Sequence, residues 1–315
     1  MIQAVVTRLQ AIARDIVLIE LQAANQQPMP GASPGAHIDL HLPNGQIRQY
    51  SLTNAQGEPT QTRYQIAVAR DASSRGGSTW IHDKLRTGAN LTISAPRNLF
   101  PLDTPTPGKI LFIGAGIGIT PIYAMVQAAQ ANGLDWQLVA CARSASRMAF
   151  QEELQALDPQ KVRFHFDMEQ GHALNLQALL GESAWSAVYA CGPAGLLDAI
   201  EQATAAWPAG SVRMERFKAQ AQDSSTHTAF QLVLAKSQQT IEVRADESPL
   251  EALERIGIDH PYACREGLCG TCEVRVLEGQ PDHKDNVLSE QDRTAGQRFI
   301  PCISRCSGLQ LVIEL

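Results

Sequence analysis

Four cysteines near the C-terminal end of the chain have the spacing of an iron–sulfur ligand set. Cys264, Cys269 and Cys272 follow a C-x4-C-x2-C pattern, and Cys302 lies well beyond them. This is the plant-type spacing for a [2Fe–2S] cluster. A tetrathiolate zinc site is the alternative, but zinc usually takes two pairs of closely spaced cysteines. We therefore predict that these four thiolates hold a [2Fe–2S] cluster.

The residues around this motif support the prediction. Gly267 and Gly270 let the backbone wrap closely, so that amide N–H groups can point at the sulfurs. Cys306 follows four residues after Cys302. Because the other four cysteines complete the ligand set, we expect Cys306 to be an ordinary small thiol, buried or partly exposed.

Two polar motifs in the first hundred residues could contact a phosphorylated ligand. The first places a cation, a ring and a hydroxyl at a strand end, as Arg48, Tyr50 and Ser51, although an ordinary strand would look the same. The second, at residues 76–79, has two glycines followed by two hydroxyls and opens a short helical pattern. Free backbone N–H groups there suit a phosphate. Alternatively, Ser78 or Thr79 is a plain helix N-cap.

A glycine-rich loop in the middle of the chain follows an apolar strand at residues 109–113 and precedes a helical pattern at 122–131. Such a loop suits a dinucleotide pyrophosphate at the helix N-terminus. Its glycines, at 114, 116 and 118, depart from the Rossmann fingerprint. We expect Thr120 to be the N-cap and Pro121 the first helical residue.

The next strand ends in Arg143 and Ser144 and not in an acid that could bind a ribose. Together with Arg147, these residues could meet a 2′-phosphate or, equally, the ribose and diphosphate of NADH. Cys141 we expect to be only an apolar strand end.

The chain divides into three stretches with different patterns of expected strands and helices, and each stretch holds one group of these motifs. At 315 residues, two or three domains are expected. Short strand-like segments with turns between them predict a small antiparallel barrel; they lie at residues 3–9, 16–21, 36–42, 47–52, 64–69 and 90–94. Strands and helices then alternate, which predicts a parallel sheet covered on both faces. A polar linker leads to a last core with strands at 230–234, 240–243, 273–277 and 309–315 and a helix from Ser248-Pro249 to residue 256.

Composition excludes several function classes. The net charge is −6 without a basic run, so we expect no nucleic-acid partner. The uncharged stretch 110–134 contains glycines, Pro121 and polar residues, which favours a strand, loop and helix over a membrane span. The first residues alternate like a strand and lack a signal segment, and seven cysteines argue against a secreted disulfide framework. We expect a cytoplasmic protein.

The first two motifs together resemble the flavin-binding barrel of the ferredoxin–NADP reductase superfamily, with its Arg-x-Tyr-Ser motif and later Gly-Ser/Thr loop. The resemblance implies that Tyr50 packs on the isoalloxazine and that Ser51 lies near its reactive nitrogen. It also implies a phosphate site at Arg48, Gly77, Ser78 and Thr79, and cofactor contacts from Ala67 and Val68.

The middle section resembles the pyridine-nucleotide domain of the same superfamily, whose glycine loop ends in Thr-Pro and whose later strand ends in Cys-Gly-Pro. Here that strand ends in Cys191-Gly192-Pro193. The resemblance implies that Cys191 lies near the nicotinamide and Thr120 near the flavin. Ser51 and Cys191 are then the expected catalytic residues, and the nucleotide contacts are Gly114, Gly116, Gly118, Arg143, Cys191, Gly192 and Pro193. Without the resemblance, Cys191 is simply another apolar strand end.

Over essentially its whole length the chain resembles the phthalate dioxygenase reductase family. This implies an FMN-binding antiparallel β-barrel (1–104), an NAD(H)-binding α/β domain (105–219), a linker (220–228) and an α+β, β-grasp [2Fe–2S] ferredoxin domain (229–315). It further implies a flavin contact at Phe217, NADH as donor, and a Rieske-type aromatic-ring oxygenase as electron acceptor. A monomer is favoured, with the oligomeric state left open.

Such a chain converts the hydride of NADH, which carries two electrons, into the single electrons that a [2Fe–2S] cluster accepts. Two other functions stay open at this point. One is a redox-sensing module without turnover, against which the complete nucleotide and flavin motifs argue. The other is a free-standing flavin or ferric reductase, for which the ferredoxin domain would be superfluous.

Overall fold

A computed structural model describes residues 1–71, 74, 76–103, 108–218 and 227–315. These residues form two compact units, Met1–Arg216 and Phe217–Leu315. The expected domain boundary at 104–105 and most of the expected linker, residues 220–226, lie outside the described residues.

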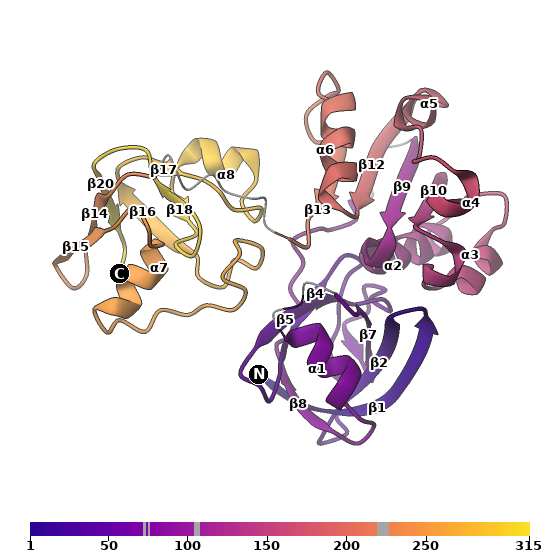
Figure 1. The fold of residues 1–315 in the computed structure, drawn as a ribbon, viewed down its shortest axis with the longest axis horizontal. Helices are drawn as coiled ribbons and strands as arrows, with labels where there is room; N and C mark the ends of the chain where they lie inside the picture. Colours follow the sequence, from indigo (N-terminus) through magenta and orange to yellow (C-terminus); the bar gives the residue numbers. More distant parts are fainter. Residues whose placement is uncertain (72–73, 75, 104–107, 219–226) are drawn as a thin grey trace. The chain divides into compact units, whose positions relative to one another are not determined.

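The first unit begins with an antiparallel barrel, as predicted (Figure 1). Its sheet has the order β5-β4-β8-β1-β2-β7, and an isolated bridge between Leu52 and Ile66 joins its two edges. Two short strands, β3 (Met29–Pro30) and β6 (Thr60–Gln61), pair separately. The six main strands are β1 (Ile2–Ala13), β2 (Ile16–Ala23), β4 (His37–His41), β5 (Ile47–Ser51), β7 (Tyr64–Ala69) and β8 (Asn90–Ile93).

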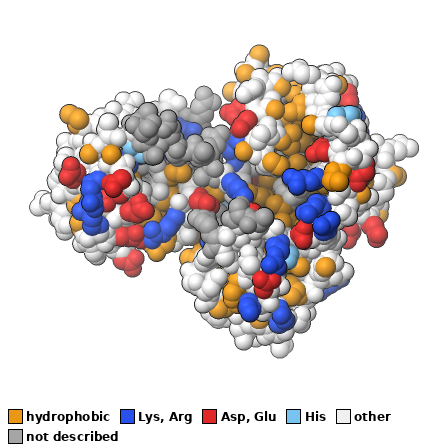
Figure 2. Space-filling view, viewed as in Figure 1, with side chains coloured by type: hydrophobic (Ala, Val, Ile, Leu, Met, Phe, Trp, Pro, Cys, Tyr) orange, Lys and Arg blue, Asp and Glu red, His pale blue; other side chains and the backbone are white. Residues whose placement is uncertain are grey.

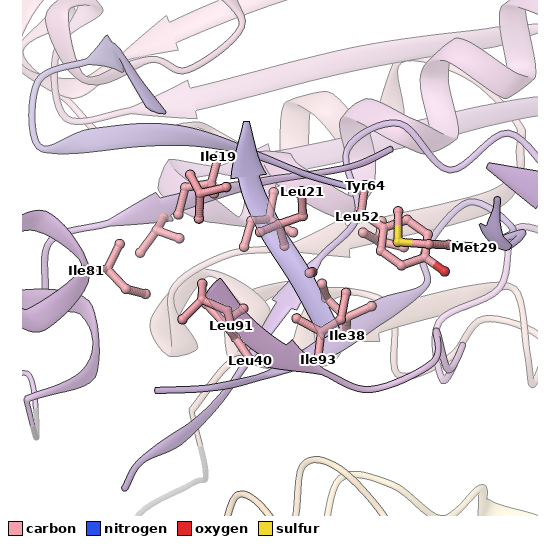
Figure 3. Close-up of a cluster of buried hydrophobic side chains, with 14 of the residues drawn as sticks. Ile19, Leu21, Met29, Ile38, Leu40, Leu52, Tyr64, Ile81, Leu91 and Ile93 are labelled. Carbon is pink, nitrogen blue, oxygen red and sulfur yellow. The ribbon is translucent and has the colours of Figure 1, made fainter. Parts of the chain in front are cut away.

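Alternating residues of these strands fill the barrel interior, because successive side chains point to opposite faces. Ile19 and Leu21 come from β2, and Ile38 and Leu40 from β4; all four are fully buried (Figure 3). Helix α1 (Gly77–Lys84) adds Ile81 to the same core. Each such side chain contributes about 1.5–3 kcal/mol through burial, which fixes α1 against the barrel.

The rest of the first unit is the predicted parallel sheet, in the order β11-β10-β9-β12-β13. The strand order reverses beside β9, and ligands bind at the carboxyl ends of the strands at such a switch point. The elements are β9 (Lys109–Ala115), η1 (Gly116–Gly118), α2 (Ile119–Ala131), β10 (Trp136–Ala142), η2 (Ala145–Arg147), α3 (Gln151–Leu157), β11 (Val162–Phe166), α4 (Asp167–Gln170), α5 (Leu176–Gly181), β12 (Trp185–Cys191), α6 (Ala194–Ala203) and β13 (Val212–Glu215).

Strand β9 is apolar throughout because both of its faces are covered. Leu111 and Ile113 pack with Leu180 of α5 and Leu197 of α6, and α2 packs against the sheet as well. The uncharged stretch 110–134 is therefore a strand, a short turn and a helix, as predicted. No helix within the described ranges combines the length and hydropathy that are needed to cross a bilayer.

The start of α2 differs from the prediction, and the alternative of a hydroxyl N-cap on α1 is not what the structure shows. Helix α2 begins at Ile119 with Gly118 as N-cap, and the Thr120 hydroxyl donates to the Ile117 carbonyl inside the turn. Helix α1 begins at Gly77 with Gly76 as N-cap at φ 100°, so Ser78 and Thr79 lie in the first turn and do not cap it. In both places a glycine starts the helix earlier than the hydroxyl would.

The second unit has the predicted α+β layout (orange to yellow in Figure 1). Its sheet order is β15-β14-β20-β16-β18, and Ala252 and Leu253 of α7 enter its core. Ser248 and Glu251 form the capping box that starts α7. The elements are β14 (Phe230–Leu234), β15 (Gln239–Val243), α7 (Pro249–Arg255), β16 (Val274–Glu278), β17 (Pro281–Asp282), α8 (Glu290–Ala295), β18 (Arg298–Phe299), β19 (Arg305–Cys306) and β20 (Gln310–Ile313).

Candidate redox and nucleotide sites

The four predicted ligand cysteines converge in the second unit. Cys264 is within hydrogen-bonding range of the thiols of Cys269 and Cys302, and Cys272 is within range of Cys302. Thiol hydrogen bonds from Cys269 and Cys302 hold the pKa of Cys264 well below its usual value. Among the described residues, no three His, Cys, Asp or Glu side chains are grouped around one metal-ion position. The thiols instead form a continuous series of contacts, a donor set that fits a two-iron cluster.

Backbone amides of the loop point at these sulfurs. Glu266 N and Leu268 N lie 3.3 and 3.4 Å from Cys264 Sγ, and Thr271 N lies 3.4 Å from Cys269 Sγ. Amide hydrogen bonds stabilise negative charge on sulfur. Gly267 adopts φ 66°, and a Cβ there would lie 2.5 Å from Ile303, so the close wrapping of the loop requires glycine.

Two buried polar residues near the loop were not predicted. Asp285 accepts hydrogen bonds from the amides of Val287 and Leu288 at 3.1 and 2.8 Å. The His260 ring lies 3.0 Å from the Cys272 carbonyl. The Asp285 contacts are a local turn of a kind that aspartate favours, whereas the His260 contact spans twelve positions and carries no local sequence signal. Cys306 is a buried thiol that donates to the Gln310 carbonyl at 3.3 Å, consistent with its expected role.

In the barrel, Arg48 and the N-terminus of α1 lie together. A Cβ on Gly77 would approach Arg48 Cγ and Nε to 2.8 Å. Arg48 also donates to Gln46 Oε1 at 2.7 Å. A guanidinium beside free helix N–H groups is a suitable phosphate site. Ser78 Oγ, however, accepts the Asp71 amide at 3.2 Å.

The other predicted flavin contacts lie where β5 approaches β7. Ser51 is buried and Tyr50 is partly buried, and burial raises the pKa of the Tyr50 phenol. Ala67 and Val68 are buried in β7, beside the bridge that joins β5 to β7. The residues fit an aromatic ring system with a phosphate, but their roles remain predictions.

A pocket of about 380 Å³ lies between the barrel and the carboxyl edge of the parallel sheet. On the side of the sheet, the pocket is lined by Gly116 and Ile117 after β9, by Cys141 to Arg143 at the end of β10, and by Pro193 after β12. On the side of the barrel, it is lined by Arg14 to Ile16, Ala69 and Arg70. Basic side chains border apolar surface on this part of the first unit (Figure 2). Cys141, expected to be only a strand end, thus also lines the pocket.

Glycines bring the loop after β9 against the end of β12. A Cβ on Gly118 would lie 2.3 Å from the Cys191 carbonyl, and one on Gly192 would lie 2.8 Å from Ala115 Cβ. Gly116 adopts φ 57° and faces open space. Gly114 packs beneath Ile119. The three glycines and Gly192 therefore let two strand ends and the start of α2 meet around the pocket.

An unpredicted acid lies beside Cys191. Glu215 is the register partner of Cys191 in the parallel pairing of β12 with β13. Burial raises the pKa of Glu215 to about 8. Its Oε2 atom is buried without a hydrogen-bond partner among the described residues. Burial, with a smaller contribution from Glu215, also raises the pKa of the Cys191 thiol. Cys191 is thus a neutral thiol.

Two of the predicted flavin contacts, Thr120 and Phe217, lie outside the groups of residues described above. Thr120 is buried within α2. Phe217 follows β13, is partly buried and belongs to the second unit. Their contacts with a flavin remain predictions.

Two domain families match the chain. The 2Fe-2S iron-sulfur cluster binding domain matches residues 232–307. The oxidoreductase NAD-binding domain matches residues 112–202. The cluster loop and the glycine loop therefore belong to a [2Fe–2S] domain and an NAD-binding domain.

Known proteins resemble the chain over its whole length. A putative toluene-4-sulfonate monooxygenase system reductase subunit of Comamonas testosteroni is 53% identical over 98% of both chains. The structure of phthalate dioxygenase reductase, described as a modular structure for electron transfer from pyridine nucleotides to [2Fe–2S], is 34% identical with a TM-score of 0.71 and covers 99% of this chain and 97% of its own. An intact type IV self-sufficient cytochrome P450 monooxygenase is 39% identical with a TM-score of 0.91 over all of this chain, which spans 41% of that longer protein.

Proposed function

We propose that this chain, which belongs to the phthalate dioxygenase reductase family, carries electrons from NADH through FMN and its [2Fe–2S] cluster to a Rieske-type aromatic-ring oxygenase. The observation that supports this most is the combination of a nucleotide pocket, an arginine-flanked helix N-terminus and a four-thiol loop on one polypeptide. A sensor would not need the pocket, and a free-standing reductase would not need the loop.

Different residues of the first unit bind the nucleotide and the flavin. When bound, the flavin takes up the hydride of NADH and passes electrons on singly. The glycine loop and the start of α2 bind the pyrophosphate, and Cys191 and Pro193 border the nicotinamide. Arg48 and α1 bind the flavin phosphate, while Tyr50 packs on the ring. Ser51 Oγ donates a hydrogen bond to the flavin.

The thiol loop fits one-electron transfer. Its amides stabilise the extra negative charge of the reduced cluster. All seven cysteines are free, as expected in the reducing cytoplasm, where we place the protein.

The acceptor is the part of the proposal that most needs a test. The anaerobically NADH-reduced protein is mixed with a purified Rieske oxygenase, and reoxidation of its cluster is followed by visible absorbance. We expect reoxidation of the cluster, whereas the flavin of a Cys302→Ser variant that lacks the cluster should stay reduced when the oxygenase is added. Failure of every Rieske oxygenase tested would contradict the proposal.

A haem oxygenase is a second candidate acceptor, because the chain also resembles part of a cytochrome P450 monooxygenase. The same mixing experiment with a P450 distinguishes the two. Reoxidation by the P450 and by no Rieske oxygenase would favour this second candidate.

A further inference from the structure

The barrel contributes a carboxylate to the nucleotide pocket. Asp15 lies in the turn between β1 and β2 and lines the pocket together with Arg147. Its Oδ2 atom lies 3.0 Å from the Arg147 guanidinium. A hairpin of the flavin-type barrel thus meets the η2 segment that follows β10.

Backbone contacts fix this hairpin in place. Arg14 N donates to the Ser146 carbonyl at 2.7 Å, and Arg70 N donates to the Asp15 carbonyl at 2.8 Å. Asp15 itself adopts φ 64°, a conformation that Asp and Asn tolerate better than most residues. The backbone of the hairpin therefore holds Asp15 within reach of Arg147.

The Asp15–Arg147 pair lies where it could affect the choice between NADH and NADPH. In sheets of this topology, the residues at the end of the second strand, here β10, lie near the adenosine ribose. Arg143, Ser144 and Arg147 follow that strand, and their cations and hydroxyl are groups that a 2′-phosphate could bind. Ser144 Oγ is already 3.1 Å from Ser146 Oγ, and Asp167 adds a second carboxylate to the pocket lining.

We propose that Asp15 disfavours NADPH by occupying Arg147, the cation that a 2′-phosphate would otherwise bind. This inference rests on the proposed NADH-dependent function. A 2′-phosphate carries close to two negative charges, so it would have to displace the Asp15 carboxylate and then lie next to it. NADH has only a 2′-hydroxyl and meets no such repulsion.

The test compares two ligands that differ only in this phosphate. Binding of 2′,5′-ADP and of 5′-AMP to the full-length protein with its cofactors is measured by isothermal titration calorimetry. In Asp15→Asn we expect the affinity for 2′,5′-ADP relative to 5′-AMP to rise about fivefold, the upper range for an exposed ion pair. The NADPH-to-NADH ratio of kcat/KM should rise with it.

Two further variants make the result specific. Glu182→Gln removes a similarly exposed surface carboxylate, paired with Arg163 at 2.8 Å outside the pocket, and should leave the ratio as in wild type. Asp15→Asn combined with Arg147→Gln should lose the gain. An unchanged ratio in Asp15→Asn, or a gain that persists without Arg147, would overturn the inference. A wild type that oxidises neither NADH nor NADPH would instead refute the proposed function.

Discussion

At the scale of single residues, folding changes the protonation state of Glu215 at neutral pH. The Glu215 carboxyl lies beside the neutral Cys191 thiol, and its Oε2 atom is buried. Its anionic form is disfavoured because no hydrogen-bond donor in the part of the chain that the structure describes replaces the water that the group loses on burial. At neutral pH the carboxyl is therefore mostly protonated. This supplies a neutral, polar wall next to the strand end that we assign to the nicotinamide.

Glu215→Gln should change how stability depends on pH. Between pH 4.5 and about 8 the unfolded chain ionises at this position and the folded chain does not, so wild type loses stability as the pH rises through that window. The glutamine variant lacks this loss. Its free energy of unfolding relative to wild type should rise by roughly 4 kcal/mol from the lower to the upper end of the window.

Urea unfolding followed by tryptophan fluorescence measures this difference, because all four tryptophans, at 80, 136, 185 and 207, belong to the first unit. If the two proteins keep a constant difference in stability across the window, Glu215 is ionised in the folded state and the assignment is wrong.

The two neighbouring cysteines 302 and 306 should behave in opposite ways. Cys302→Ser removes a thiol that contacts Cys264 and Cys272, so we expect loss of the visible cluster absorbance. Cys306→Ser keeps a hydroxyl that can donate to Gln310, so its spectrum should match wild type. Loss of the cluster in the Cys306 variant instead would mean that the ligand set is misassigned.

At the scale of elements, the nucleotide pocket depends on how closely the loop after β9 packs against the end of β12. Gly118 has an ordinary helical φ of −62°, so its requirement for glycine comes from the neighbouring carbonyl and not from its own backbone. The pocket shape thus depends on one contact between two strand ends.

Gly118→Ala should push these strand ends apart. The added Cβ would lie 2.3 Å from the Cys191 carbonyl, and overpacking of this kind costs about 1–3 kcal/mol. We expect lower thermal stability and a higher KM for NADH. Gly195→Ala is the matched control, since its Cβ meets open space within α6 and alanine is the better helix former. Equal effects from the two changes would rule out the packing explanation.

Local patterns predicted the elements and ligands that depend on local chemistry. The cysteine spacing, the glycine loop and the alternation of strands each lie within short stretches, so the three-part fold followed from them. The start of α2 was predicted too late because the chain is already helical in η1, and the alternative of a hydroxyl cap on α1 fails because Gly76, at φ 100°, takes that position. Glu215 and Asp15 were missed because strand pairing and hairpin docking bring them to their sites.

At the scale of the whole molecule, the two units place all the redox groups on one polypeptide. The donor site belongs to the first unit and the thiol loop to the second. A tether of this kind converts an encounter between two proteins into an intramolecular step, with an effective concentration on the order of millimolar. Transfer to the cluster should then be insensitive to protein concentration.

The most direct test is anaerobic stopped-flow reduction of the purified protein by NADH at several protein concentrations, with flavin and cluster absorbance recorded together. We predict that both chromophores are reduced and that the rate constant for the cluster stays the same on dilution. A cluster that remains oxidised while NADH is consumed, or a rate constant that falls in proportion to dilution, would contradict the account.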